Sequence, residues 1–276
     1  MKKYLIILLI LMASPSILKA EETLLIYNKS NNTKSTLPKN FRDLSDIGLN
    51  AIASGQFSEG ELKEIQKKYP NQKFIILDLR RESHGFINGK AVSWYGKFNK
   101  SNENKTADEI IKDEQTLLEK LKDDKKATIS DIVKKDKQKG WFKETKSEIV
   151  DVNTSESELK LAKKYGFEYK RIPVIDHNAP TSDQLQQYVD FIKNLPVDTK
   201  VYVHCAGGKG RTTTFLAVYD IIKNGKNLTI DKILTRQHNA GGSDLNKTDD
   251  EEADWNSALK VKKLDFIQKF YEDNIK

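Results

Sequence analysis

The stretch KVYVHCAGGKGRTTTFLAVYD, residues 200–220, predicts a strand, a glycine-rich loop and a helix in direct succession. Its first part, KVYVHC, is apolar enough for a buried strand. From Thr212 to Lys223 the chain is apolar on most sides, which predicts a helix in the interior of the protein. Strands that alternate with helices are typical of α/β folds, so this stretch indicates the fold class.

Strands and helices continue to alternate on both sides of this stretch. Apolar runs bounded by turn-forming or charged residues predict strands at 74–79 (FIILDL) and 169–175 (YKRIPVI). The helical spacing of apolar residues predicts helices over residues 107–121, 157–165, 183–195, 228–238 and 257–271. We therefore expect an α/β domain built from residues 21–96 and 154–276.

Residues 97–153 interrupt this regular pattern. They are rich in Lys, Asp, Glu and Asn. Beyond the expected helix they contain only short β-like pieces around Ile129, Trp141 and Ile149. We interpret 97–153 as an inserted helix and small β subdomain.

The first twenty residues, MKKYLIILLILMASPSILKA, have the pattern of an export signal. A basic start precedes an apolar run, and small residues lead to Ala20. The run is too short to span a bilayer in a mature protein, and an uncleaved anchor is the alternative. We expect a signal peptide over residues 1–20, a secreted or periplasmic protein, and no stable membrane insertion after cleavage.

Composition and charge exclude other classes of protein. A hydrophobic fraction of 37% is enough to build a core, so disorder throughout the chain is excluded. The formal net charge is +7, and removal of residues 1–20 takes away three lysines and no acid. The small excess that remains does not indicate a nucleic-acid partner.

The loop between the strand and the helix carries the chain's one cysteine, Cys205, and ends at Arg211. A lone Cys in an exported protein cannot form an internal disulfide, so it is either an idle buried residue or a reactive one. Three glycines let the loop amides approach an anion at the N-terminus of the following helix. The helix dipole and Arg211 favour a thiolate, which can attack phosphorus. The pattern therefore predicts a phosphate-binding loop with Cys205 as the nucleophile.

The other residues of the loop have expected roles that follow from this prediction. Arg211 can hold two phosphate oxygens with its planar guanidinium. Thr212 can donate a hydrogen bond to the Cys205 sulfur and help it to leave in the second step. We expect phosphate to be bound as well by the loop backbone, which belongs to Ala206, Gly207, Gly208, Lys209 and Gly210.

Displacement of an alkoxide from phosphorus also needs a proton donor at the leaving oxygen. Asp176 follows a predicted strand and precedes a predicted helix. A carboxyl group in such a loop can reach the phosphate, and the alternative is a solvated turn capped by Thr181, Ser182 or Asp183. We interpret Asp176 as the general acid, and as the general base when water cleaves the phosphocysteine.

The segment HCAGGKGRT (204–212) has the His-Cys-x5-Arg-Thr pattern of protein tyrosine phosphatases and their relatives. The wider chain resembles one branch of these enzymes, the tyrosine-phosphatase-like inositol polyphosphate phosphatases, or cysteine phytases, of bacteria. The resemblance extends over most of the chain after residue 20. Besides the Cys loop it rests on LPKNFRDL (37–44), DLRRESHGFINGKAVSWY (78–95), RIPVIDHNAPT (171–181) and RQHNAGG (236–242).

This resemblance implies a protein-tyrosine-phosphatase-like α/β domain, with a central mixed sheet flanked by helices and a small β-barrel-like inserted subdomain. It implies a phosphocysteine mechanism that uses no cofactor and no metal. It also implies stepwise removal of phosphates from inositol hexakisphosphate or lower inositol phosphates, so the expected partner is a small-molecule substrate. The sequence has no zinc-type His/Cys spacing, EF-hand loop or Walker loop.

Some outer residues match substrate contacts of the family. By resemblance, His177 and Arg42 contact substrate phosphate, and the alternative for Arg42 is a surface residue of an N-terminal loop. Lys263, near the start of the last predicted helix, can line the pocket. In the family a Lys often follows the Trp that matches Trp255, whereas this chain has Asn256 there.

Two further residues each allow two interpretations. Lys209 either adds positive charge to the floor of the pocket, as in phosphoinositide phosphatases, or is a surface lysine without a partner. His84 is either a core histidine bonded to the backbone or a ligand contact near the end of a predicted strand.

The whole pattern predicts a cysteine-dependent phosphatase of inositol polyphosphates. A protein tyrosine or phosphoinositide phosphatase with the same Cys205, Asp176 and Arg211 is the alternative. A phosphate-binding module without turnover is a third hypothesis, which the presence of all three residues disfavours.

Overall fold

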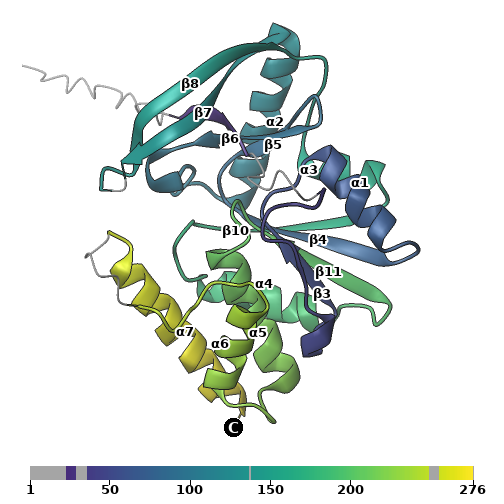
Figure 1. Ribbon diagram of the computed structural model, residues 1–276, viewed down its shortest axis with the longest axis vertical. Coiled ribbons are helices and arrows are strands. Elements are labelled where there is room, and N and C mark those ends of the chain that lie inside the picture. Colours follow the sequence, from purple (N-terminus) through teal and green to yellow (C-terminus); the bar gives the residue numbers. More distant parts are fainter. Residues whose placement is uncertain (1–22, 29–35, 137, 249–254, 276) are drawn as a thin grey trace, which may run out of the picture.

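The structure is a computed structural model that describes residues 23–28, 36–136, 138–248 and 255–275 (Figure 1). The predicted signal peptide lies outside the described residues. The described part consists of two β-sheets and the helices that surround them. No helix in that part is long and apolar enough to cross a membrane.

The central sheet has five strands in the order β10-β4-β11-β3-β2. The neighbouring pairs β10–β4, β4–β11 and β11–β3 are parallel, whereas β2 is antiparallel to β3, so the predicted mixed sheet is confirmed. The predicted strands at 74–79 and 169–175 correspond to β4 and β10. The strands are β2 (Arg42–Asp43), β3 (Ala51–Ser54), β4 (Lys73–Arg80), β10 (Glu168–Val174) and β11 (Thr199–His204).

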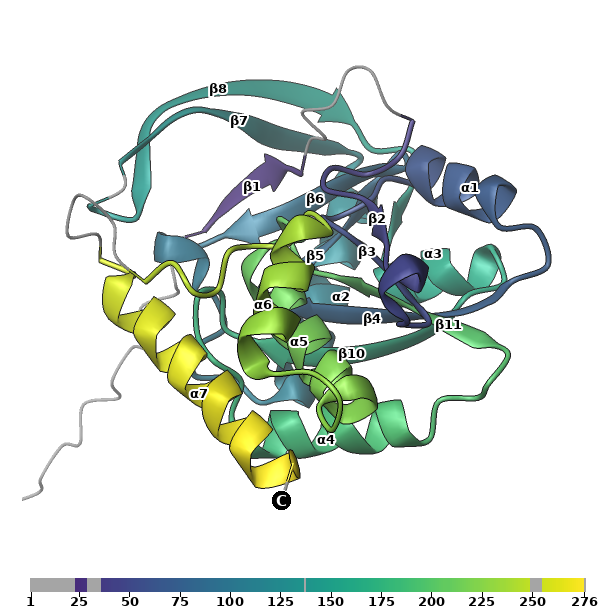
Figure 2. The ribbon, with the colours of Figure 1, turned by 60° about the horizontal axis from the view of Figure 1, so that its bottom comes forward.

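Helices cover both faces of the central sheet (Figures 1 and 2). Side chains alternate between the faces along each strand, so Val201 and Val203 of β11 join one hydrophobic cluster and Tyr202 joins the other. Burial on both faces explains the continuous apolar runs of β4 and β11, residues 74–77 and 201–203. The first face packs against α4 (Ser182–Lys193), α5 (Gly210–Asn224), α6 (Ile230–Asn239) and α7 (Ser257–Ile275). The second face packs against α1 (Glu59–Lys68) and α3 (Glu158–Lys164).

The α5 helix lies in the interior, as its apolar composition predicts. Every residue from Arg211 to Ile221 is buried. The helix packs against α4, α6 and α7 as well as β11. Since α5 follows the Cys loop directly, its burial holds one end of that loop in place.

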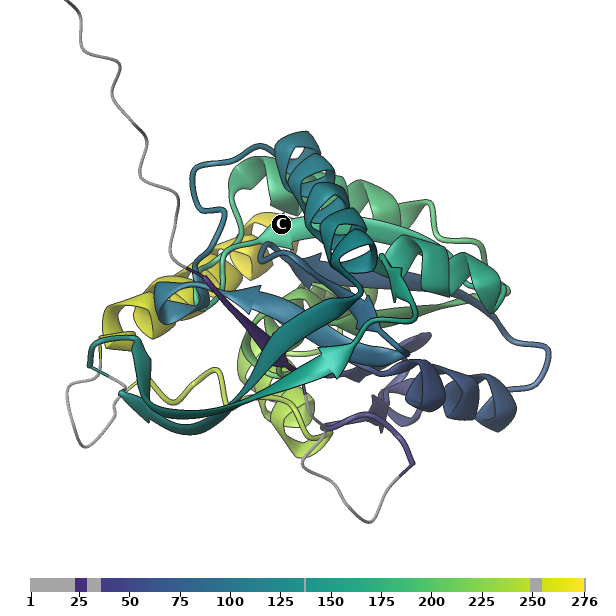
Figure 3. The same cartoon turned by 90° about the horizontal axis from the view of Figure 1, so that it is seen from above.

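The second sheet has six strands in the order β8-β7-β1-β6-β5-β9. The long β7–β8 hairpin forms one side of it, and α2 (Ala107–Asp124) packs on the sheet (Figure 3). The short β-like pieces predicted after residue 126 are two continuous strands, because β7 and β8 pair along most of their length. The strands are β1 (Leu24–Tyr27), β5 (His84–Ile87), β6 (Lys90–Tyr95), β7 (Lys126–Asp136), β8 (Trp141–Asp151) and β9 (Ser155–Glu156).

The structure does not confirm a β-barrel-like form for this subdomain. In the described residues β8 and β9 are the two edges of the sheet, so the strands form an open layer. The sheet also takes β1, β5, β6 and β9 from outside the predicted insertion, residues 97–153. The domain boundaries stay a prediction.

Side-chain caps explain where several helices begin. At α4, Thr181 accepts from the amide of Gln184, and the Gln184 side chain accepts from the amide of Thr181. Thr106 and Glu109 form the same reciprocal pair at α2. Two short 3-10 helices, η1 (Ser45–Ile47) and η2 (Lys97–Asn99), follow β2 and β6.

Candidate active site

The carboxyl ends of three parallel strands place the site residues together. The strands β4, β10 and β11 are neighbours and run in the same direction, so the segments that follow them leave from one edge of the sheet. The Cys loop follows β11, Asp176 follows β10, and Glu82 follows β4. The candidate site lies at this edge.

The Cys loop depends on a glycine at its centre. The amide of Gly208 donates a hydrogen bond to Cys205 Sγ over 3.2 Å, which stabilises a thiolate. Gly208 has a φ of 69°, and a Cβ added there would lie 2.2 Å from the backbone nitrogen of Gly55. Only glycine fits at this position, because the left-handed conformation and the close backbone both exclude a side chain.

Arg42 is buried and holds the backbone of the Cys loop. Its Nη1 donates to the carbonyl of Gly208 over 2.8 Å, and Asn40 Nδ2 donates to the carbonyl of Gly207 over 2.8 Å. Burial lowers the pKa of Arg42 to about 10, against the opposing effect of Cys205. These contacts make Arg42 a positioning residue of the loop, and its contact with substrate phosphate stays a prediction.

The guanidinium of Arg211 is buried and oriented by several acceptors. Nη1 and Nη2 donate to the two carboxylate oxygens of Glu82 over 2.8 and 3.0 Å. Nη1 also donates to the carbonyl of Val174 over 3.0 Å, and Nε lies 3.2 Å from Asp176 Oδ1. A bidentate pair fixes the plane of the guanidinium, which sets the direction in which it can meet phosphate oxygens.

Glu82 belongs to the site, although its sequence context did not single it out. It is fully buried and accepts hydrogen bonds from Arg80 and Arg211. Burial raises the pKa of Glu82, but the two guanidiniums outweigh this effect and hold the pKa below its usual value. Glu82 is therefore an anion that keeps Arg211 in place. Its sequence signal, an acid beside two arginines, is equally typical of an exposed turn.

Both carboxylate oxygens of Asp176 are engaged. Oδ2 accepts from Asn99 Nδ2 over 2.6 Å, and Oδ1 accepts from the amide of His177 over 3.0 Å. Burial raises the pKa of Asp176, but Arg211, His177 and the Asn99 hydrogen bond outweigh it, so the pKa lies below the usual value. Asp176 is thus a carboxylate at neutral pH in this structure, directly beside the predicted phosphate-binding guanidinium.

His177 lies in the same cleft as Asp176. Its φ is 66°, and such left-handed residues other than glycine concentrate at functional sites. The imidazole packs edge-on against Trp255, with ring centroids 4.8 Å apart. Burial lowers the pKa of His177 despite the opposing effect of Asp176. A neutral imidazole can still donate one hydrogen bond to phosphate.

Thr212 and Lys209 lie differently from expectation, whereas the substrate contact of Lys263 stays a prediction. Thr212 is fully buried, and its hydroxyl has no hydrogen-bond partner among the described residues, so the expected bond to Cys205 is not formed here. Lys209 Nζ donates to the carbonyl of Gly241 over 2.6 Å, so it does have a partner. Lys209 and Lys263 line a separate cavity of about 360 Å³ beside the loop, so Lys209 is not at the floor of the Asp176 cleft.

A cleft of about 570 Å³ lies between the Cys loop and the second sheet. Two cations line it that the sequence did not single out, Lys39 before β2 and Lys135 on β7. Burial lowers the pKa of both lysines, and Asp176 acts in the opposite direction on Lys135. Lys135 also lies over the ring of Tyr95, 5.0 Å from its centroid. The same cleft is lined by Arg80, Asn99, Asp176, His177, Ala206 and Gly207.

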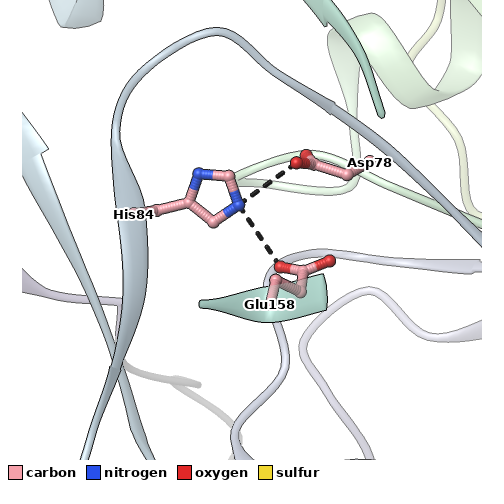
Figure 4. Close-up of side chains that lie close together, drawn as sticks. All are labelled: Asp78, His84 and Glu158. Atoms are coloured by element: carbon pink, nitrogen blue, oxygen red, sulfur yellow. Dashed lines mark ion pairs between the residues drawn. The ribbon is translucent and has the colours of Figure 1, made fainter. Parts of the chain in front are cut away.

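Next to the site, Asp78, His84 and Glu158 form a fully buried cluster (Figure 4). His84 Nε2 lies 3.2 Å from Asp78 Oδ2 and 3.3 Å from Glu158 Oε2. Burial lowers the pKa of His84, but Asp78 outweighs it and the pKa rises to about 9. The other ring nitrogen, Nδ1, lies 2.9 Å from the carbonyl oxygen of Glu82, so His84 is a core histidine bonded to the backbone within a buried ion-pair network.

The network extends to the strand that carries the nucleophile. His204, which precedes Cys205, has its Nε2 2.6 Å from Glu158 Oε1. Glu158 Oε2 accepts from Gln56, and Arg171 Nε lies 3.1 Å from Asp78 Oδ2. Because buried charges are stable only when paired, these contacts hold His204 in one orientation beside the Cys loop.

Two solved structures are similar to this chain over most of its length. The PTP-like myo-inositol phosphatase from Mitsuokella multacida, in complex with myo-inositol-(1,3,4,5)-tetrakisphosphate, is 32% identical with a TM-score of 0.81. That similarity covers 91% of this chain and 45% of the Mitsuokella chain. A PTP-like phytase from Bdellovibrio bacteriovorus is 26% identical with a TM-score of 0.73, over 92% of this chain and 89% of that one.

A curated relative and a family model complete the comparison. Effector protein hopD2 of Pseudomonas syringae pv. tomato is 29% identical over 240 residues, which are 83% of this chain and 48% of hopD2. This chain spans about half the length of hopD2 and of the Mitsuokella protein. The PTP-like phytase model, described as "Inositol hexakisphosphate", matches residues 77–223. Since this match takes in more than half of the chain and includes Asp176, Cys205 and Arg211, the protein belongs to the PTP-like phytase family.

Proposed function

We propose that this protein is a cysteine-dependent phosphatase that hydrolyses phosphomonoesters of myo-inositol polyphosphates. The observation that carries the proposal is the geometry around one loop. An amide donates to Cys205, Glu82 orients Arg211, and Asp176 lies 3.2 Å from Arg211 Nε. A nucleophile, a clamp for charged oxygens and a proton donor are what phosphoryl transfer to a thiol needs.

In the first step the Cys205 thiolate attacks phosphorus. An S–P bond forms while the bond from phosphorus to the inositol oxygen breaks, and the proton of Asp176 moves to that oxygen. Arg211 and the loop amides stabilise the charge on the other phosphate oxygens. The products are a phosphocysteine and an inositol with one phosphate fewer.

In the second step water attacks the phosphocysteine. The Asp176 carboxylate takes a proton from the water, an O–P bond forms, and the S–P bond breaks to release inorganic phosphate and the thiolate. We assign to the Thr212 hydroxyl a hydrogen bond to the departing sulfur. The reaction as written uses no cofactor and no metal.

Asp176 must carry a proton in the first step, although Arg211 holds its pKa below the usual value. A phosphate dianion that binds in the loop competes for Arg211 and adds negative charge beside Asp176. Both effects raise the pKa of a carboxyl group. Protonation of the acid is therefore coupled to substrate binding.

The cations around the loop favour a small substrate with several phosphates. Lys39 and Lys135 line the cleft, and Lys209 and Lys263 line the neighbouring cavity. A singly phosphorylated tyrosine leaves most of these ammonium groups without an anion, whereas phosphates around a ring can pair with several. The inositol tetrakisphosphate bound by the Mitsuokella phosphatase supports the same substrate class.

We also propose that the protein acts after export, in the periplasm or the medium. The proposal rests on the basic, apolar and small-residue pattern of residues 1–20. N-terminal sequencing of the exported protein is expected to begin at or near Glu21. Full-length protein that begins at Met1 and stays with the membrane fraction contradicts the proposal.

Phosphate release under reducing conditions tests the enzymatic function. We expect fast release from inositol hexakisphosphate and slow release from a phosphotyrosine peptide. Cys205→Ser is expected to abolish release. Asp176→Asn is expected to slow it about 10²–10⁴-fold, the usual contribution of a general acid. A preference for the peptide indicates a tyrosine phosphatase, and binding without release from either compound indicates a binding module.

A further inference from the structure

We propose that Asn99 is the positioning residue of the proton donor, and that its amide ties Asp176 to the Glu82–Arg211 pair. This inference rests on the phosphatase function proposed above. Neither the motif pattern nor the predicted site includes Asn99, which lies in η2 at the end of β6. Asn99 therefore connects the second sheet to the candidate site at the edge of the central sheet.

One side-chain amide contacts both anions of the site. Asn99 Nδ2 donates to Asp176 Oδ2 over 2.6 Å and to Glu82 Oε1 over 3.3 Å. Both acceptors are carboxylate oxygens, so the amino group and not the carbonyl of Asn99 must face them. Asn99 is only 9% exposed, so water competes little for these bonds. Since Glu82 also binds Arg211, the Asn99 amide contacts both the proton donor and the carboxylate that orients Arg211.

The backbone holds Asn99 in an unusual conformation. Phe98 and Asn99 have φ values of 55° and 56°. The amide of Asn99 donates to the carbonyl of Gly96 over 2.8 Å, and that of Phe98 donates to Gly140, in the β7–β8 turn, over 2.7 Å. The Phe98 ring packs on Trp255, with centroids 4.4 Å apart. Left-handed residues other than glycine cluster at functional sites, and here contacts with Gly96, Gly140 and Trp255 hold two of them in succession.

A neutral donor at this place has a defined effect on the acid. It stabilises the carboxylate of Asp176, whereas a carboxylate in the same place would repel it and favour the protonated form. The other charged or titratable groups that act on Asp176 come from several elements. They are Arg211 on α5, Lys263 on α7, Lys135 on β7, Tyr95 on β6, Glu82 after β4 and His177 in the same loop.

Two variants of Asn99 separate positioning from general structural support. Asn99→Ala is expected to slow phosphate release from inositol hexakisphosphate by about 10-fold or more, because a misplaced acid protonates the alkoxide poorly. The loss with p-nitrophenyl phosphate is expected to be much smaller, since nitrophenolate leaves without a proton. Asn99→Asp, which has nearly the same shape, is expected to move the alkaline limb of the kcat/KM profile upward by about one pH unit.

Asn102→Ala is the matched control. Asn102 is another buried amide in the same connection, and its Nδ2 donates to Ser83 Oγ over 3.0 Å. Its loss is expected to lower the melting temperature without changing the ratio of the two substrate rates. In an Asp176→Asn background, Asn99→Ala is expected to add little, because it acts through that carboxyl group.

Three results overturn the inference: equal losses on both substrates, full additivity with Asp176→Asn, or an unmoved alkaline limb in Asn99→Asp. If Asp176→Asn itself leaves release from inositol hexakisphosphate unchanged, the proposed role of Asp176 fails instead. If Asp176→Asn slows release but Asn99→Ala does not, only the role of Asn99 is wrong.

Discussion

At the scale of single residues, the site depends on buried groups that orient the reactive ones. Glu82 is fully buried and binds Arg80 and Arg211 together, and the sulfur of Cys205, the predicted nucleophile, accepts a hydrogen bond from the Gly208 amide. Removal of one member of a buried charge cluster leaves the others unpaired in a medium of low polarity. Such residues therefore affect folding and catalysis at once.

Glu82→Gln is expected to lower the free energy of unfolding by about 3 kcal/mol or more, because two buried guanidiniums lose their shared anion. It is also expected to slow phosphate release, since Arg211 loses its orientation. Asp198→Asn is the control for stability, because its ion pair with Lys73 is exposed and screened by water. Urea unfolding measures the free energy of unfolding of both variants. Equally small decreases in the two would contradict the role of Glu82.

Gly208→Ala is expected to destabilise the protein by about 1–3 kcal/mol and to disable the loop. The added Cβ meets backbone atoms of Ser54 and Gly55 at 2.2 Å, and φ is left-handed. Gly207→Ala is the comparison for unfolding, because nothing lies within 4 Å of a Cβ there. Thermal unfolding of the two variants checks the prediction, which is wrong if both melt at the same temperature.

At the scale of elements, the β7–β8 hairpin completes the cleft from the second sheet. Trp141 and Phe142 of β8 pack near Tyr95, with ring centroids 6.1 and 4.8 Å from the tyrosine ring. Lys135 of β7 lies over the same tyrosine and lines the cleft. The aromatic contacts thus hold the end of the hairpin against β6, and with it one cationic wall.

Lys135→Ala is expected to raise KM for inositol hexakisphosphate several-fold and to change KM for p-nitrophenyl phosphate much less. The reason is that p-nitrophenyl phosphate has no second phosphate group that could contact Lys135 on β7. Lys134→Ala is the matched control, because Lys134 is exposed like Lys135 but does not line the cleft. Steady-state kinetics on both substrates give the result, and an equal change for both would contradict a role in binding outer phosphates.

At the scale of the whole molecule, a buried ion-pair network joins the two sheets. Asp78 belongs to β4 of the central sheet, and His84 belongs to β5 of the second sheet. Glu158 of α3 contacts both His84 and His204. Both sheets therefore depend on one set of paired charges, which couples folding to pH.

The protonation of His84 is expected to stabilise the folded protein at low and neutral pH. Its pKa rises from the ordinary 6.5 to about 9 on folding. This contribution is fully present below pH 6.5 and is lost as the pH rises through about 9, with a total of about 3 kcal/mol. Urea unfolding between pH 6 and pH 9.5 measures how the free energy of unfolding declines as the pH rises. His84→Gln is expected to flatten this decline, whereas His238→Gln, at an exposed residue, is not. If the free energy of unfolding declines equally steeply in His84→Gln and in the unchanged protein, the prediction is wrong.

Local sequence was enough to predict most of the main elements and the loop that carries Cys205. The helix and strand periods depend only on residues close in the chain, so β4, β10, β11 and the helices α2 to α7 were predicted, whereas α1 and β3 were not. The Cys loop is likewise a continuous segment whose glycines, Cys205 and Arg211 adjoin a strand and a helix. Asp176 was predicted because it lies in a loop between a predicted strand and a predicted helix and matches the family's general acid by resemblance, and the structure places it at the same edge of the sheet as Cys205.

What the sequence by itself determined is therefore the α/β class, the loop with Cys205 and Arg211, and the family resemblance, because each depends on short continuous segments. Only the tertiary structure decided which distant groups meet. Glu82 and Arg211 are 129 residues apart, and Asn99 and Asp176 are 77 apart. Tertiary structure likewise decided the open form of the second sheet, the hydrogen-bond partner of Lys209, and the positions of Lys39 and Lys135 in the cleft. The physical reason is that burial and pairing of charges depend on how the two sheets pack, which no local pattern of residues records.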